Sequence, residues 1–74
     1  TTEDGIKRIK EFFGNLLDWK DINELIPVNF IGKKELRRSG TAGLFSASLE
    51  LAKEGSLSIK QKKLFDSIFI KEKQ

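Results

Sequence analysis

Apolar residues recur at helical spacing in the first part of the chain. Between residues 1 and 17 they fall on one side of a helical wheel, and the basic residues fall elsewhere. The apolar set comprises Ile6, Ile9, Phe13, Leu16 and Leu17. Glu3 and Asp4 lie in the first turn, where the helix dipole favours negative charge. The pattern predicts an amphipathic helix over residues 1–17, weakened near its end by Gly14 and Asn15.

Two short elements are expected next. Residues 18–20 alternate polar, aromatic and polar, which is typical of a minimal strand. Asp21 followed three residues later by Glu24 resembles a capping box, the start signal of a helix. An apolar side follows and ends at Pro27. We therefore predict a short strand, then a short second helix, and a connection over residues 28–32.

A long third helix is predicted over residues 33–54, with Gly55 ending it. Its apolar and small side chains cover an arc of about 180° on the helical wheel. The arc contains Ala42, Leu44, Phe45, Ser48, Leu49, Leu51 and Ala52. Because one core needs a narrower arc, this helix is either buried on two sides or keeps one edge free for a partner. Gly40 and Gly43 each weaken a helix by about 1 kcal/mol relative to alanine, and we attribute them to close helix packing.

The hydrophobic period changes to two near the end of the chain, which predicts a hairpin with strands over residues 57–61 and 68–71. The loop between them contains Leu64 and Phe65, so we expect it to fold back on the body. We also expect the strand 68–71 to lie at the outside, with backbone groups free to extend a partner's sheet. The order of elements predicts an α+β winged helix, mostly α, with a three-helix core and a two-stranded wing.

The composition favours one small folded domain over residues 1–74, because 38% of the residues are hydrophobic and 34% are charged. The chain starts without methionine, directly in front of a helical pattern, so we expect a piece of a longer protein. No apolar run approaches the ~20 residues of a bilayer span, and the acidic start does not resemble a signal peptide. We therefore expect no membrane association.

The residue types present argue against catalysis. Cysteine and histidine are absent, which excludes disulfides, thiol nucleophiles, histidine bases and the usual zinc sites. The acidic residues fit helix starts or solvated faces, and the glycine-rich stretch 39–43 lacks the ending of a phosphate loop. The sequence thus predicts a non-enzymatic domain with no metal and no cofactor.

Basic residues gather where a winged helix faces DNA, and the formal net charge is +3. They are Lys33, Lys34, Arg37 and Arg38 at the start of the third helix, and Lys60, Lys62 and Lys63 in the wing. Farther along the helix, Glu50 and Glu54 would face the phosphates and weaken the electrostatic attraction. DNA binding through the basic residues, a simple solvated basic face, and self-association through surplus apolar side chains stay open as alternatives.

The stretch 41–51, Thr-Ala-Gly-Leu-Phe-Ser-Ala-Ser-Leu-Glu-Leu, followed by Gly55, Gln61, Phe65 and Ile68, resembles the C-terminal signature of the ScpA family, the bacterial kleisins called segregation and condensation protein A. Ile6 to Trp19 and Leu25-Ile26-Pro27 resemble the part that precedes this signature, so the likeness covers nearly the whole chain. Ser46 and Ser48 replace the leucines that many relatives carry, and Gly40 and Gly43 are unusual in so helical a stretch.

The resemblance implies a C-terminal winged-helix domain that docks on the ATPase head of an SMC protein. By the same resemblance, it would help to close the SMC–kleisin ring in chromosome condensation and segregation during cell division. It also implies that ScpB binds other parts of the full-length protein, that DNA is the ring's cargo, and that the location is cytoplasmic and nucleoid-associated. We expect the SMC-facing surface to comprise Leu44, Phe45, Leu49, Ile68 and Ile70. We assign Ile6, Ile9, Phe13, Leu16, Trp19, Ile22, Leu25, Ile59 and Phe65 chiefly to the core.

Overall fold

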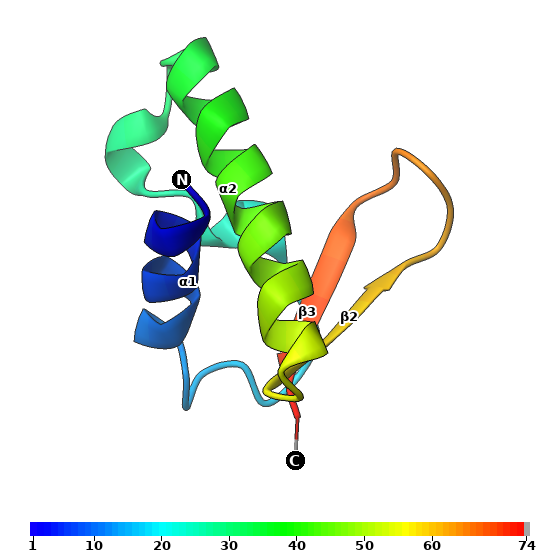
Figure 1. The fold of residues 1–74 in the computed structure, drawn as a ribbon. Helices are drawn as coiled ribbons and strands as arrows, with labels where there is room; N and C mark the ends of the chain where they lie inside the picture. The colour runs from blue at the N-terminus through cyan, green and yellow to red at the C-terminus, as the bar shows by residue number, and fades with distance from the viewer. Residues whose placement is uncertain (74) are drawn as a thin grey trace.

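A computed structural model describes residues 1–73, which form two α-helices, two short 3-10 helices and a three-stranded antiparallel sheet (Figure 1). The elements are α1 (Thr2–Glu11), β1 (Lys20–Asp21), η1 (Ile22–Leu25), η2 (Val28–Phe30), α2 (Lys34–Lys53), β2 (Leu57–Gln61) and β3 (Ile68–Glu72). The helix α1 lies beside α2, and the hairpin β2–β3 follows the C-terminal end of α2 (Figure 1). The predicted α+β class is confirmed.

The first helix is shorter than predicted. Its start is a capping box, in which the Thr1 hydroxyl oxygen accepts from the Asp4 amide at 3.1 Å and the Asp4 carboxylate accepts from the Thr1 amino group at 3.4 Å. Its end at Glu11, instead of residue 17, comes from Gly14, whose φ of 95° is incompatible with a right-handed helix. The Glu72 carboxylate of β3 then accepts hydrogen bonds from the backbone N–H groups of Gly14 and Leu16, which holds the loop after α1 in place.

The predicted second helix is a short 3-10 turn, η1. Only two of the three helices expected in the core are therefore α-helices. Asp21 caps η1 by accepting from the Asn23 amide at 2.9 Å. The expected capping-box partner, Glu24, instead lies 3.8 Å from the Lys20 ammonium group. The predicted strand at residues 18–20 is displaced to Lys20–Asp21, where it pairs with β3.

The long helix α2 is confirmed. It ends in a Schellman motif, with the Ser56 amide donating to Leu51 O and the Gly55 amide donating to Ala52 O, and Gly55 has a φ of 87°. The helix runs unbroken through Gly40 and Gly43. Gly43 contacts the backbone of Thr1 and that of Gly5, so close helix packing is the reason for the glycine at this position.

The hairpin strands are confirmed, but their places in the sheet are not as predicted. The strand order is β1-β3-β2, so β3 is central and pairs with both neighbours. The prediction of a free backbone edge along residues 68–71 is therefore wrong at Phe69 and Ile70, because these residues pair with β1. The free edge of the hairpin belongs to β2.

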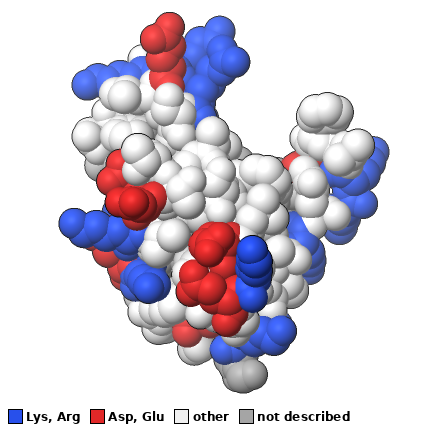
Figure 2. Space-filling model, in the orientation of Figure 1, with Lys and Arg blue, Asp and Glu red and all other residues white. Residues whose placement is uncertain are grey.

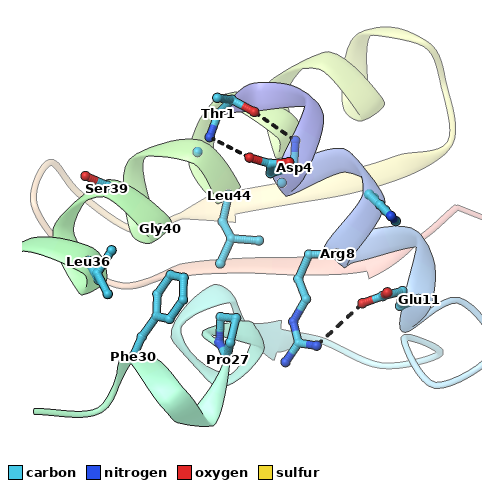
Figure 3. A pocket seen from close by; sticks show the side chains of 13 residues that line it. Thr1, Asp4, Arg8, Glu11, Pro27, Phe30, Leu36, Ser39, Gly40 and Leu44 are labelled. Carbon is cyan, nitrogen blue, oxygen red and sulfur yellow. Dashed lines mark hydrogen bonds and ion pairs between the residues drawn. The ribbon is translucent and has the colours of Figure 1, made fainter. Parts of the chain in front are cut away.

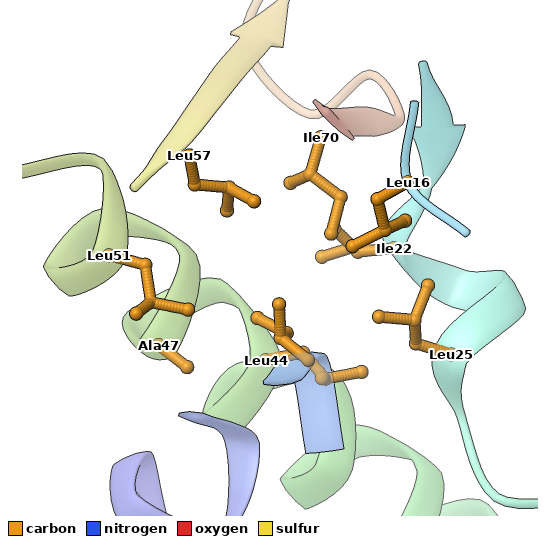
Figure 4. Packing of buried hydrophobic residues seen from close by; sticks show 9 residues of the cluster. Leu16, Ile22, Leu25, Leu44, Ala47, Leu51, Leu57 and Ile70 are labelled. Atoms are coloured by element: carbon orange, nitrogen blue, oxygen red, sulfur yellow. The ribbon is translucent and has the colours of Figure 1, made fainter. Parts of the chain in front are cut away.

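The core lies where the two α-helices, η1 and the inner face of the sheet meet (Figure 4). It contains Ile9, Leu16, Ile22, Leu25, Leu44, Ala47, Leu51, Leu57 and Ile70. Ile6 and Ile59 pack against it, and Trp19 is half-buried. The core assignments of Phe13 and Phe65 are wrong, since these side chains are 37% and 99% exposed.

Candidate partner-docking surface

The side of α2 that faces the hairpin is only partly covered. Phe45 and Leu49 lie one turn apart on this side and are 39% and 48% exposed. Burial places Leu44 and Ile70 in the core instead, where both point at the centre of the cluster in Figure 4. Of the five residues expected to face a partner, Phe45, Leu49 and the half-buried Ile68 are thus available at the surface.

A groove of about 800 Å³ lies between α2 and the start of β3. Phe45, Ala42 and Thr41 line it from α2, and Ile68 lines it from the hairpin. Figure 2 shows this region as a hollowed surface between the upper part of α2 and the hairpin, with mostly uncharged side chains. Lys34, Arg37, Arg38 and Gly32 complete the lining. The groove thus combines apolar walls with a basic end, which suits an apolar protein segment that carries acidic residues.

The hairpin tip adds a second apolar feature that the sequence prediction placed wrongly. Leu64 and Phe65 do not fold back on the body, because they are 79% and 99% exposed. The tip projects away from the helices (Figure 1). The sequence does carry an indication of this exposure, because charged residues flank the two apolar ones. Lys62 and Lys63 precede them, and Asp66 follows them.

On the face shown in Figure 2, the basic residues do not form one continuous surface. In Figure 2 they form separate groups at the upper end of α2 and along the hairpin, with uncharged surface between them. Lys60 pairs with Phe69, on the sheet face opposite Ile59 and Ile70, and its ammonium group lies 4.2 Å from the centre of the Trp19 ring. Lys60 therefore belongs to the outer face of the sheet, away from the groove.

A second hollow, of about 450 Å³, lies between α1, η2 and the first half of α2 (Figure 3). Asp4, Arg8 and Glu11 on its wall take part in contacts within the fold. Arg8 donates to the carbonyl oxygen of Leu25 at 2.7 Å and lies 3.5 Å from Glu11. The Thr1 side chain and amino group lower the pKa of the Asp4 carboxyl by hydrogen bonding to it. Phe30 and Leu36 supply the apolar lining.

Within residues 1–73, no three or more acidic side chains come together in a way that would hold a metal ion. Neither α-helix in that range is long and apolar enough to cross a membrane.

No family model matches the sequence. Searches for similar curated proteins and for similar solved structures found no match either.

Proposed function

We propose that this chain is a non-enzymatic adaptor domain that docks on the ATPase head of an SMC protein, as the C-terminal domain of a ScpA-type kleisin. The observation that carries the proposal is an exposed apolar pair on α2: Phe45, which lines the groove, and Leu49, one helical turn farther along. Large apolar side chains beside a groove are natural anchors for a protein interface. The resemblance of residues 41–68 to the ScpA signature supplies the identity of the partner.

The fold supports the same proposal at the level of architecture. A winged helix has a helix directly before a two-stranded wing, and a short first strand that joins the wing's sheet. Here α2 precedes the hairpin and β1 pairs with β3. η1 and η2 occupy the chain position of the second helix. The winged-helix assignment is part of the proposal, and the fold is compatible with it.

Surface charge favours a protein over DNA as the partner of α2. Glu50 and Glu54 follow the exposed Leu49, and both carboxylates are exposed. A DNA backbone laid along this part of α2 would be repelled by them. A protein surface can offer basic or neutral groups there while it covers Phe45 and Leu49.

The test is calorimetric titration of the folded chain with the isolated SMC head from the same genome, at a salt concentration of about 150 mM, where exposed charges are screened beyond ~8 Å. We expect one-to-one binding that Phe45→Arg weakens by at least about tenfold, or ~1.4 kcal/mol. Ser46→Arg is the matched control, because Ser46 is the exposed neighbour outside the groove lining. Trp19 fluorescence checks folding in each variant. A folded wild-type chain that gives no binding signal would refute the proposal.

DNA binding is the second candidate, favoured by the exposed Lys34, Arg37 and Arg38 at one end of the groove. Contacts to several phosphates make DNA affinity fall steeply between about 50 and 200 mM salt, whereas an apolar dock changes little. Titration of a DNA duplex at both salt concentrations separates the two candidates. Sedimentation at several protein concentrations tests the third class, self-association, for which a clean monomer is the opposing result.

A further inference from the structure

The most exposed large hydrophobic side chain of the described residues is held in a conformation that phenylalanine rarely adopts. Phe65, at the hairpin tip, is 99% exposed and has a φ of 70°. A positive φ is unusual for any residue with a side chain and is a marked outlier for a bulky one. A fully exposed ring gains no stability from burial, so neither packing nor backbone preference explains phenylalanine at this position.

The tip is ordered by its own hydrogen bonds. The Asp66 amide donates to the carbonyl oxygen of Lys63 at 3.1 Å, which closes a four-residue turn with Phe65 at its third position. The Gln61 side-chain amide donates to the carbonyl oxygen of Asp66 at 2.8 Å. Turns with a positive φ at the third position prefer glycine there. The turn therefore presents Phe65 and its neighbour Leu64 outward in a fixed backbone conformation.

Charge surrounds these two apolar side chains. Lys62 and Lys63 precede them and are exposed. We propose that Leu64 and Phe65 form an anchor that inserts into an apolar pocket with an acidic rim on a partner protein, with Phe65 as the main contact. The inference rests on the proposed function, because that pocket would belong to the SMC head. Pre-ordering of the turn favours binding, since little backbone freedom is then lost on association.

A protein pocket fits the tip better than a membrane surface does. Only two apolar side chains project from the tip, whereas stable membrane anchoring needs a larger apolar area or a second signal. An anionic bilayer would attract Lys62 and Lys63 and repel Asp66, so the small apolar area of the tip is what argues against a membrane. A single aromatic ring on an ordered turn instead matches the size of one pocket, and aromatic side chains dominate binding energy at protein interfaces.

The first experiment compares Phe65→Gly with the wild-type chain, in stability and in affinity for the SMC head. Glycine accepts the positive φ, so we expect the variant to unfold at an equal or higher temperature. We expect its affinity for the head to fall by at least about tenfold, mainly through faster dissociation. Ile31→Ala is the matched control, because Ile31 is a large exposed side chain outside the groove and the tip, 69% exposed. It should bind like the wild type.

Charge and partner class are tested by two further measurements. The double variant Lys62→Glu, Lys63→Glu should weaken head binding more at low salt than at high salt. Sedimentation with vesicles of phosphatidylserine and phosphatidylcholine tests the lipid alternative, and binding that depends on Phe65 would overturn the inference. If the wild type binds the head and Phe65→Gly binds it with the same affinity, the anchor inference is overturned while the proposed function stands. An absence of head binding by the wild type would refute both.

Discussion

Gly5 of α1 packs directly against the backbone of Gly43 of α2. A Cβ atom at Gly5 would overlap the Gly43 carbonyl group, lying 2.8 Å from its carbon, and would lie 2.9 Å from the Ala47 side chain. The two helices therefore approach as closely as their backbones allow. This contact fixes α1 on one side of α2 and leaves the other side, with Phe45 and Leu49, toward the hairpin.

Gly5→Ala should destabilise the fold, although alanine is the better helix former. The added methyl group meets backbone atoms that cannot move aside, so we expect a loss of about 1–3 kcal/mol in the free energy of unfolding. Urea unfolding followed by fluorescence of Trp19, the only tryptophan in the chain, measures it. Gly40→Ala is the control. Its Cβ would meet the Phe30 ring at 3.1 Å, and a ring can shift more easily than backbone. Equal losses in the two variants would contradict the assigned cause.

Two leucines of α2, one buried and one half-exposed, should respond differently to truncation. Leu44→Ala removes a buried side chain and should lower the free energy of unfolding by about 2–5 kcal/mol. Leu49→Ala removes a half-exposed one and should change it by less than about 1 kcal/mol. Thermal unfolding of both variants checks the comparison. A large loss in Leu49→Ala would place Leu49 in the core and remove it from the docking surface.

Glu72 should stabilise the loop that follows α1. Its carboxylate accepts the backbone N–H groups of Gly14 and Leu16, which lie more than fifty positions earlier in the chain. Glu72→Ala removes the partner of these donors, one of which is exposed to water, and should lower the free energy of unfolding by about 0.5–1.5 kcal/mol. Hydrogen exchange at the amides of Gly14 and Leu16 provides the local measurement. Unchanged exchange rates in a destabilised variant would show that Glu72 acts elsewhere.

Lys60 and Lys71 should affect the environment of Trp19. Their ammonium groups lie 4.2 Å and 5.0 Å from the centre of the indole ring. Lys60→Met keeps an apolar stem over the ring and removes the charge, so we expect a shifted Trp19 emission and a stability loss below about 1 kcal/mol. Lys62→Met, farther along the same hairpin, is the matched control and should leave the emission unchanged. Identical spectra for Lys60→Met and the wild type would contradict the contact.

The residues expected to face SMC show that a sequence pattern alone does not distinguish buried from exposed positions on α2. Periodicity placed Leu44 and Phe45 correctly on one broad apolar arc of α2, but it did not distinguish the buried position from the exposed one. The distinction arises because α1 and the sheet cover only part of that arc. Phe65 shows the converse case, since its size suggested burial while its place in a projecting turn exposes it.

Local sequence was sufficient for α2 and for both strands of the hairpin. A twenty-residue helix with Gly55 at its end, and strands with a period of two, depend on interactions between near neighbours in the chain. The tertiary structure decided the central place of β3 and the position of the loop after α1. These features depend on contacts between distant segments, such as Phe69 with Asp21 and Glu72 with Gly14. The free energy of such contacts exists only once the chain has folded, so no local pattern of residues encodes them.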